Sequence, residues 1–142
     1  MKSVKTGAEV LMINSYVKDL SFKNPRAPIV YSKDEISPEV NVNIGINVTQ
    51  IDNSVYEVEI VVDTEAKSNS GVVYSLKLVH AGLFELKNIS ESLVEQALYI
   101  DCPYLLFPFA RNVISNVTMS GNFPPLMLNY VDFDKLYSER TK

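Results

Sequence analysis

Side chains that could perform nucleophilic or acid–base chemistry are few in this sequence. The chain contains one histidine, His80, and one cysteine, Cys102. A zinc site needs several nitrogen or sulfur ligands, so neither residue has the partners for one. His80 lies inside an apolar strand pattern and Cys102 precedes a proline near a helix entrance, positions that favour packed structural roles. The sequence therefore predicts no metal centre, and a small enzyme that uses Cys102 or His80 remains only a minor alternative.

Acidic side chains recur along one stretch of the chain, where they alternate with apolar residues. They are Glu57, Glu59, Asp63 and Glu65. Successive side chains of a strand point to opposite faces, so these carboxylates share one solvated face rather than a catalytic cleft. No phosphate-binding loop, dinucleotide fingerprint or nucleophile elbow occurs in the sequence. We therefore expect no enzyme and no cofactor, and interpret the acidic face either as a solubility feature or as a docking face for a basic partner.

The elements that position these residues are predicted to be antiparallel strands. Four stretches have strand patterns: residues 9–23, 39–51, 55–66 and 72–86. Short turns join the last three, and Gly82 is expected to mark a bulge or a twist. Residues 24–38 contain three prolines and predict an irregular connection with a short extended piece at 29–31. Strands followed by helices that cover their apolar face predict an α+β fold, in a single domain spanning residues 1–142.

Helical patterns follow the strands. Residues 90–99 fit a short helix, and residues 107–120 carry apolar residues at helical spacing. Pro108 is expected near the start of the second helix, because deeper inside it would remove a hydrogen bond. Gly121 suits a left-handed cap at its end. A last short helix is predicted over residues 133–140.

The stretch 101–137 holds more aromatic and aliphatic surface than a small domain buries easily. After Gly121, the adjacent prolines 124 and 125 keep the backbone extended among large apolar side chains. Each of these residues alone fits an ordinary core. Together, an apolar helix, an extended apolar arm and a short apolar-faced helix predict a trough that binds other chains.

Composition narrows the class of protein further. The formal net charge is −4, and no basic cluster is interleaved with aromatic residues, so nucleic acid is not an expected partner. No signal-peptide core and no long apolar run occurs, so neither export nor membrane insertion is expected. A single cysteine allows no intrachain disulfide, which favours the cytoplasm.

A series of short motifs resembles the SecB family of export chaperones, in order and over nearly the whole length. The most specific block is Cys102–Arg111, which contains Cys-Pro-Tyr-Leu-Leu-Phe-Pro-Phe-Ala-Arg. The others are Tyr16–Phe22 with Asn24–Pro28, Pro38–Val40, Val55–Val58, Ala81–Phe84, Gly121–Pro125 and Val131–Asp134.

The resemblance implies a four-stranded antiparallel sheet with two main helices packed on one face, assembled as a homotetramer that is a dimer of dimers. It implies an ATP-independent holdase that binds unfolded preproteins in apolar grooves, keeps them competent for translocation and delivers them to the motor protein SecA. By the family pattern the peptide-binding groove would comprise Tyr31, Phe107, Phe109, Phe123, Leu126, Met127, Tyr130, Phe133 and Tyr137. The SecA-docking face would comprise Asp19, Glu57, Glu59, Asp63 and Glu65.

This chain departs from the family pattern in ways that concern both surfaces. Glu35 and Ile36 stand where the family usually has a tryptophan, and Lys23 and Lys77 stand where typical members have glutamate. The long acidic tail of typical members does not follow the last predicted helix. A SecB-like chaperone dedicated to one client or to an antitoxin is therefore the alternative to general export. We also expect the apolar stripe of residues 107–120 to supply the contact between dimers.

Overall fold

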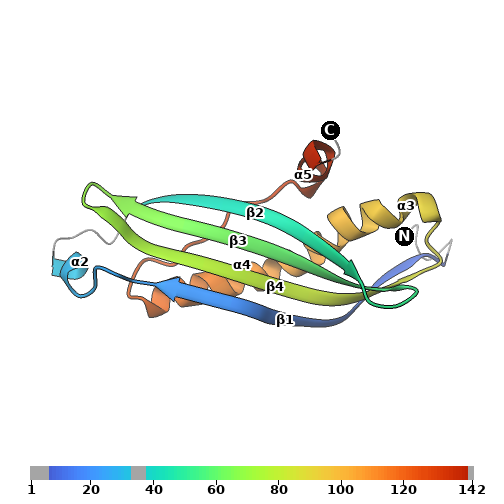
Figure 1. The fold of residues 1–142 in the computed structure, drawn as a ribbon, viewed down its shortest axis with the longest axis horizontal. Helices are drawn as coiled ribbons and strands as arrows, with labels where there is room; N and C mark the ends of the chain where they lie inside the picture. Colours follow the sequence, from blue (N-terminus) through green and yellow to red (C-terminus); the bar gives the residue numbers. More distant parts are fainter. Residues whose placement is uncertain (1–6, 33–37, 141–142) are drawn as a thin grey trace.

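The computed structural model describes residues 7–32 and 38–140, and a four-stranded antiparallel sheet forms its centre (Figure 1). The strands are β1 (Glu9–Lys23), β2 (Glu39–Gln50), β3 (Val55–Ser68) and β4 (Gly71–Lys87). Their spatial order is β1-β4-β3-β2, so β1 and β2 form the two edges. All four predicted strands are confirmed, within about two residues at each end.

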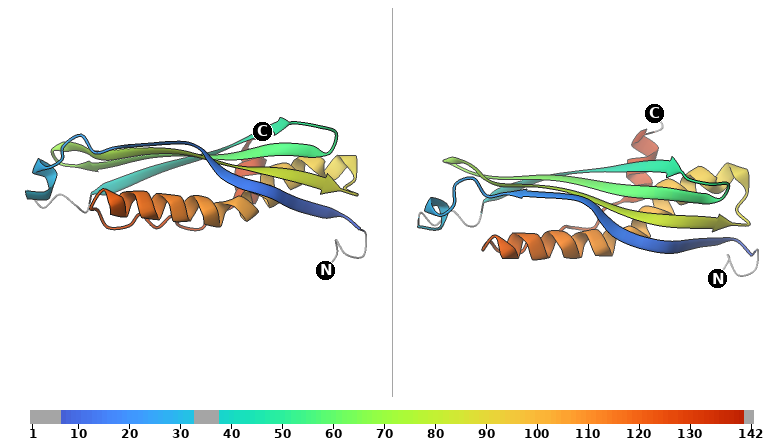
Figure 2. Two further views of the ribbon diagram at one scale, coloured as in Figure 1. Left: turned by 90° about the horizontal axis from the view of Figure 1, so that it is seen from below. Right: turned by 60° about the horizontal axis from the view of Figure 1, so that its bottom comes forward.

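The two faces of the sheet differ as the alternation predicts. On β3, the side chains of Val58, Ile60 and Val62 are fully buried, whereas the residues between them are only partly covered. Their partners Gly82, His80 and Leu78 on β4 are also buried. Figure 2 shows the helices along this face, while no helix of the described residues covers the opposite face. The sheet is therefore covered on one side only, as predicted.

Gly82 does not mark a bulge. It pairs regularly with Ser15 of β1 and Val58 of β3, and the register shifts of β1 lie at Ile13 and Lys18 instead. A Cβ atom on Gly82 would lie 2.7 Å from Cδ2 of Leu106 and 2.7 Å from a ring carbon of Phe84. The glycine is thus required because a helix packs closely over this point of the sheet.

The helical patterns after the strands join into one continuous run. It comprises α3 (Glu91–Gln96), a π-helical turn η1 (Ala97–Asp101) and α4 (Cys102–Ser120). The prediction that α4 starts near Pro108 is wrong, because Pro108 lies inside the helix and Pro103 occupies its first turn. The amide of Cys102 donates to the carbonyl of Ala97, five residues back, and this wider turn carries the helix up to Pro103.

The end of α4 also differs from the expectation. Gly121 has φ −82°, and Asn122 takes the left-handed conformation with φ 65°. A Cβ atom on Gly121 would lie 2.7 Å from the ring of Phe22. Gly121 is therefore needed for the approach of β1, and the polar Asn122 tolerates the left-handed turn.

Two short helices complete the chain. The prediction of an extended piece at 29–31 is wrong, because α2 (Ile29–Ser32) forms one helical turn directly after Pro28, whose fixed φ suits a helix start. Beyond α4, the chain runs without regular structure until α5 (Phe133–Arg140), as predicted. Asp132 caps α5, since its Oδ1 accepts a bond of 3.1 Å from the amide of Lys135. Glu35 and Ile36 lie outside the described residues.

Candidate functional site

An apolar cavity of about 330 Å³ opens between the edge strand β2 and helix α5. Its walls include Ile44 and Ile46 of β2, Tyr99 of η1, and Leu136 and Tyr137 of α5. Gly45 separates the two isoleucines in the strand, and a Cβ atom there would point to the opposite face of the sheet, where it would meet nothing within 4 Å. The outer edge of β2 has no neighbouring strand among the described residues. A cavity with this lining can accept large apolar side chains.

Helix α5 is held over this cavity by its last turns. The hydroxyl of Tyr137 donates to Oε1 of Glu95 at 2.7 Å, a bond that raises the pKa of Tyr137. The guanidinium of Arg140 lies 4.0 Å from the ring centroid of Tyr99 and donates to its hydroxyl at 2.9 Å. The rings of Tyr99 and Tyr137 stack with centroids 5.9 Å apart. These exposed contacts fasten α5 to α3 and η1.

Of the residues assigned to the peptide-binding groove, two lie inside the core of this chain. Phe133 is fully buried, and Phe107 is nearly so. Their rings meet edge to face with centroids 5.8 Å apart, and Phe133 makes a similar contact with Tyr104 at 4.9 Å. Phe133 therefore anchors α5 to α4 and helps to form the floor on which the β2–α5 cavity is built.

Tyr31 and Phe123 lie together at the end of the sheet where α2 is located (Figure 1). Phe123 is buried against Tyr74, with ring centroids 4.8 Å apart. Tyr31 is partly exposed, and its hydroxyl donates to the carbonyl of Gly121 at 2.7 Å. These two residues thus form a second aromatic cluster, separate from Tyr137 and the cavity beside β2.

Three of the assigned groove residues are open to solvent. Phe109 is 46% exposed, Met127 59% and Tyr130 76%. The ring of Tyr130 stacks on Tyr104, and their hydroxyls lie 2.8 Å apart. Leu126, on the same arm as Met127 and Tyr130, is half-buried, and its amide donates to Oγ1 of Thr118 at 2.9 Å. The arm is thus pinned to α4 by its backbone while it presents apolar side chains outward.

The carboxylates assigned to a docking face all project from the open face of the sheet, but two of them share one lysine there. Lys18, extruded at a register shift of β1, contacts Glu57 and Glu59 at 2.7 Å each. The hydroxyl of Tyr16 also donates to Glu57 at 2.6 Å. Hydrogen bonds from Lys18 and Tyr16 hold the pKa of Glu57 below its ordinary value. Lys18 therefore offsets one of the two negative charges in this part of the face.

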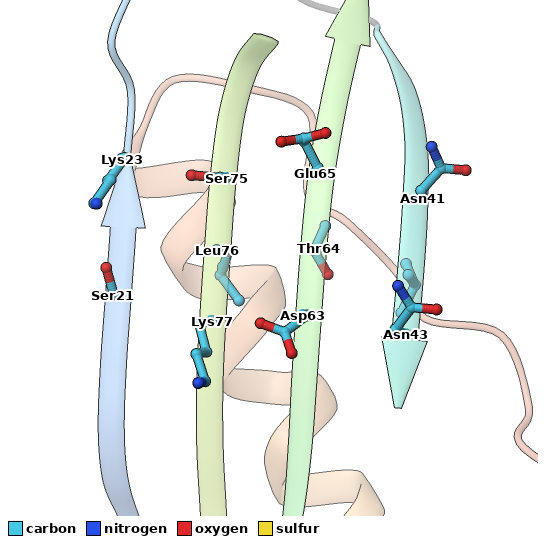
Figure 3. A pocket seen from close by; sticks show the side chains of 11 residues that line it. Ser21, Lys23, Asn41, Asn43, Asp63, Thr64, Glu65, Ser75, Leu76 and Lys77 are labelled. Atoms are coloured by element: carbon cyan, nitrogen blue, oxygen red, sulfur yellow. The ribbon is translucent and has the colours of Figure 1, made fainter. Parts of the chain in front are cut away.

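Towards the α2 end, the same face carries both signs of charge (Figure 3). Lys77 of β4 lies opposite Asp63 of β3, and Glu65 lies one row away, opposite Ser75. Lys23 of β1 joins the row of Ser75. These side chains surround an open polar hollow of about 710 Å³. Asp19 is exposed on β1 near this region. The face is thus mixed rather than acidic.

His80 and Cys102 occupy structural positions. His80 is 5% exposed, and its ring stacks on Phe109. Nε2 of His80 and the hydroxyl of Ser15 form a hydrogen bond of 2.9 Å. Burial lowers the pKa of His80 and raises the pKa of Cys102 to about 12, so both are neutral near pH 7. In the described ranges, no group of three metal-ligating side chains converges. No described helix is long and apolar enough to cross a membrane.

Comparison with known proteins decides the family. The family model described as "Preprotein translocase subunit SecB" matches residues 4–142. The chain belongs to the SecB family. It is 42% identical over 134 residues to the protein-export protein SecB of Zymomonas mobilis, covering 94% of this chain and 81% of that protein. It is 37% identical over 128 residues to SecB of Afipia carboxidovorans, covering 90% and 80%. SecB proteins are chaperones of protein export, so the resemblance read from the motifs is confirmed.

A solved structure shares the fold of this SecB chain. It is the Mycobacterium tuberculosis SecB-like chaperone Rv1957, in complex with a ChAD peptide from the Rv1956 HigA1 antitoxin. The TM-score is 0.71 at 16% sequence identity, covering 87% of this chain and 91% of that one. The expected α+β fold with a four-stranded antiparallel sheet is confirmed.

Sequence reasoning missed the part of the site that β2 and η1 supply. Ile44 and Ile46 were interpreted only as the inward face of a strand, and they do face the helices. They are half-buried because β2 is an edge strand, which alternation alone does not reveal. Tyr99 and Leu136 belonged to helices whose mutual position was unknown. The aromatic and aliphatic character of both residues was the only available signal.

Proposed function

We propose that this SecB protein is a single-domain, ATP-independent holdase of the cytoplasm that keeps unfolded preproteins competent for translocation. The observation that carries the proposal is the apolar cavity of about 330 Å³ between β2 and α5, lined by Ile44, Ile46 and Tyr137. An unfolded chain exposes apolar side chains, and such a cavity accepts them by burial without a fixed sequence code.

Exposed side chains extend the client surface beyond that cavity. Tyr130 and Met127 project from the arm between α4 and α5, and Phe109 projects from α4. Exposed apolar side chains of this size bind partner chains by the same burial. We assign Tyr130 and Met127, with Tyr137 and the half-buried Leu126, to client contact, and Phe109 to the surface that a second copy would cover. Phe107 and Phe133 would support this surface from the core, whereas Phe123 belongs to the separate aromatic cluster at the α2 end.

The assembly proposed is a homotetramer built as a dimer of dimers, with α4 between dimers. Val17 on the edge strand β1 lies opposite His80, whose ring stacks on Phe109 of α4. Val17 and Phe109 are 44% and 46% exposed, so an apolar strip runs from the sheet edge to the helix. A second copy would cover this strip and use the unpaired edge of β1.

Delivery to SecA would use the open face of the sheet. The mixed charges around Lys23, Lys77 and Asp63 favour a partner that presents both signs, rather than a purely basic one. The same charges are the reason to keep a second candidate function, a chaperone dedicated to one client or antitoxin. Binding to purified SecA distinguishes them: salt-sensitive binding supports export, and no binding supports the dedicated role.

The decisive experiment is light scattering coupled to size exclusion, with and without a reduced, unfolded precursor. Four chains of 15.9 kDa that capture the precursor without nucleotide are expected. A tetramer that ignores unfolded chains would contradict the holdase function, and a stable monomer would contradict the assembly.

A further inference from the structure

The arm between α4 and α5 presents a thioether to solvent at Met127. The side chain of Met127 is 59% exposed, whereas Leu126 before it is half-buried and Leu128 after it is buried. The amide of Leu126 is bound to Oγ1 of Thr118 on α4. Met127 therefore projects outward from a stretch of the arm that is fixed on both sides.

The sulfur of Met127 has a hydrogen-bond donor beside it. Oγ of Ser115, on α4, donates to Sδ of Met127 at 3.5 Å. A thioether sulfur is a weak acceptor, so this bond holds the reduced side chain only loosely. Oxidation would convert the thioether into a polar sulfoxide, whose oxygen is a much stronger acceptor for the same hydroxyl. Ser115 is thus placed to stabilise the oxidised side chain more than the reduced one.

The other sulfur atoms of the described residues differ from this one. Met12 of β1 is 36% exposed and Met119 of α4 is 48% exposed, so a dissolved oxidant reaches both. In the described ranges, no hydrogen bond is formed to the sulfur of Met12 or Met119, and neither residue belongs to the surface assigned to client contact. Cys102 is buried, and burial raises the pKa of its thiol to about 12, so the reactive thiolate is scarce.

We propose that Met127 is an oxidation site through which a peroxide lowers the affinity of this SecB protein for its clients. The sulfur lone pair forms a bond to one oxygen of hydrogen peroxide, and the O–O bond breaks. The proton on the transferred oxygen passes to the departing hydroxide, which leaves as water. The thioether is oxidised to a sulfoxide and the peroxide is reduced to water. This inference rests on the proposed holdase function and adds a means of regulating it.

Oxidation changes what Met127 offers to a client in two ways. The reduced side chain is apolar and flexible, so it can leave its weak bond to Ser115 and pack against varied clients. The sulfoxide is polar, and covering it with an apolar segment costs free energy. Its stronger bond to Ser115 would also keep the side chain on α4 and away from the client. Ser115 is therefore a positioning residue for the oxidised state. Methionine sulfoxide reductases restore the thioether, so the change is reversible.

The test uses the full-length protein before and after treatment with hydrogen peroxide, which is removed with catalase before binding is measured. Peptide mass spectrometry identifies the oxidised methionines. Anisotropy titrations follow a fluorescent, extended apolar peptide that contains no methionine. Its Kd should rise roughly three- to tenfold when Met127 is oxidised, because a polar group enters an apolar contact. Reductases that act on both sulfoxide epimers should restore the original Kd, and light scattering should show the same assembled mass throughout.

Three variants assign the effect to its residues. Met127→Leu keeps a side chain of similar volume that peroxide does not oxidise, so its Kd should not change on treatment. Met119→Leu is the matched control, because Met127 remains and the Kd should rise as in the unaltered protein. Ser115→Ala should bind the peptide normally before oxidation. It should lose less affinity afterwards, because no hydroxyl then holds the sulfoxide on α4.

The outcomes separate the oxidation site from the function on which it rests. If the reduced protein binds no peptide, the holdase proposal fails and this inference fails with it. If Met127 is fully oxidised and the Kd is unchanged, the holdase stands and the oxidation site is overturned. It is also overturned by a rise that persists in Met127→Leu or that accompanies a change in assembled mass, because oxidation elsewhere would then be responsible. An equal rise in Ser115→Ala would overturn the role of Ser115.

Discussion

The hydroxyl of Tyr137 donates a hydrogen bond of 2.7 Å to Oε1 of Glu95, across 42 residues of sequence. This bond joins the last helix to the first helix of the run that covers the sheet. Because Tyr137 also lines the cavity beside β2, the side chain that fixes the position of α5 would, under the proposed function, also contact a bound client. The width of the cavity therefore depends on an exposed, breakable contact.

We predict that Tyr137→Phe loosens α5 without unfolding the chain. The phenyl ring keeps its stacking on Tyr99, but the bond to Glu95 is lost. Amide hydrogen exchange in residues 133–140 should become faster, because local opening of a short exposed helix becomes less costly. Glu95→Gln is the matched variant, since it keeps an acceptor and should cause a smaller change. Exchange that accelerates equally across β3 would mean that Tyr137 supports the whole fold instead.

We predict that Ile46→Ala weakens client binding at the cavity beside β2. Ile46 lines the cavity and is half-buried, so the shorter side chain removes apolar contact area from its wall. The Kd for an extended apolar peptide should rise roughly tenfold, which corresponds to about 1.4 kcal/mol. Gly45→Ala is the matched control, because its Cβ atom points to the opposite face of the sheet and meets nothing within 4 Å. Unchanged affinity in an Ile46→Ala protein of normal stability would remove this cavity from the client surface.

We predict that Lys18→Met makes the open sheet face more negative. Without the ammonium group, Glu57 and Glu59 lose their 2.7 Å contacts, and the pKa of Glu57 should rise towards its ordinary value of 4.5. A carbon-detected NMR titration of the glutamate carboxylates measures this shift. Lys87→Met is the control, because Lys87 is exposed at the far end of β4. A Glu57 pKa that stays low would assign the effect to Tyr16 alone.

The strands could be predicted from sequence because alternation is a direct consequence of a sheet covered on one side. The start of α4 could not, because Pro108 was expected to remove a backbone hydrogen bond if it lay deeper inside a helix. Pro108 is exposed, and the π-turn of η1 brings the chain to Pro103 without a break. The packing of Leu106 and Ala110 against the sheet therefore outweighs the cost of the hydrogen bond that Pro108 cannot form.

The candidate site was only partly accessible to sequence reasoning. Aromatic content identified Tyr137 and Tyr130, but it could not separate them from Phe133, which has the same apolar character and is fully buried. The charges of the open face were identified as well. Their pairing was not, because the reach of Lys18 depends on a register shift of β1 that leaves no mark in the sequence.

We predict that Gly82→Ala destabilises the folded chain by about 1 to 3 kcal/mol, the usual cost of overpacking a core. The new methyl group would collide with Leu106 and Phe84, which are both fully buried and have little room to move. Gly45→Ala adds the same group where nothing lies within 4 Å and should change the free energy of unfolding by less than about 0.5 kcal/mol. Urea denaturation at one protein concentration measures both. Equal stability of the two variants would contradict the close packing of α4.

We predict that His80 makes the folded state less stable as the pH falls below about 6.5. Burial lowers the pKa of His80 in the folded chain from its ordinary value of 6.5. The unfolded chain therefore binds the proton first, and the free energy of unfolding decreases from about pH 6.5 down to the folded pKa, below which it changes no further through this group. The contribution is fully present above pH 6.5.

His80→Gln isolates this effect. Glutamine does not titrate and can still form a hydrogen bond with the hydroxyl of Ser15. Urea denaturation at a series of pH values between about 7.5 and 5 should show a difference between the two proteins that depends on pH only below about 6.5. Below pH 5, protonation of Glu57 affects both proteins alike, because its pKa is also lowered in the folded chain. A difference that is constant across this range would mean that His80 is solvated and titrates normally, which would contradict its burial under Phe109.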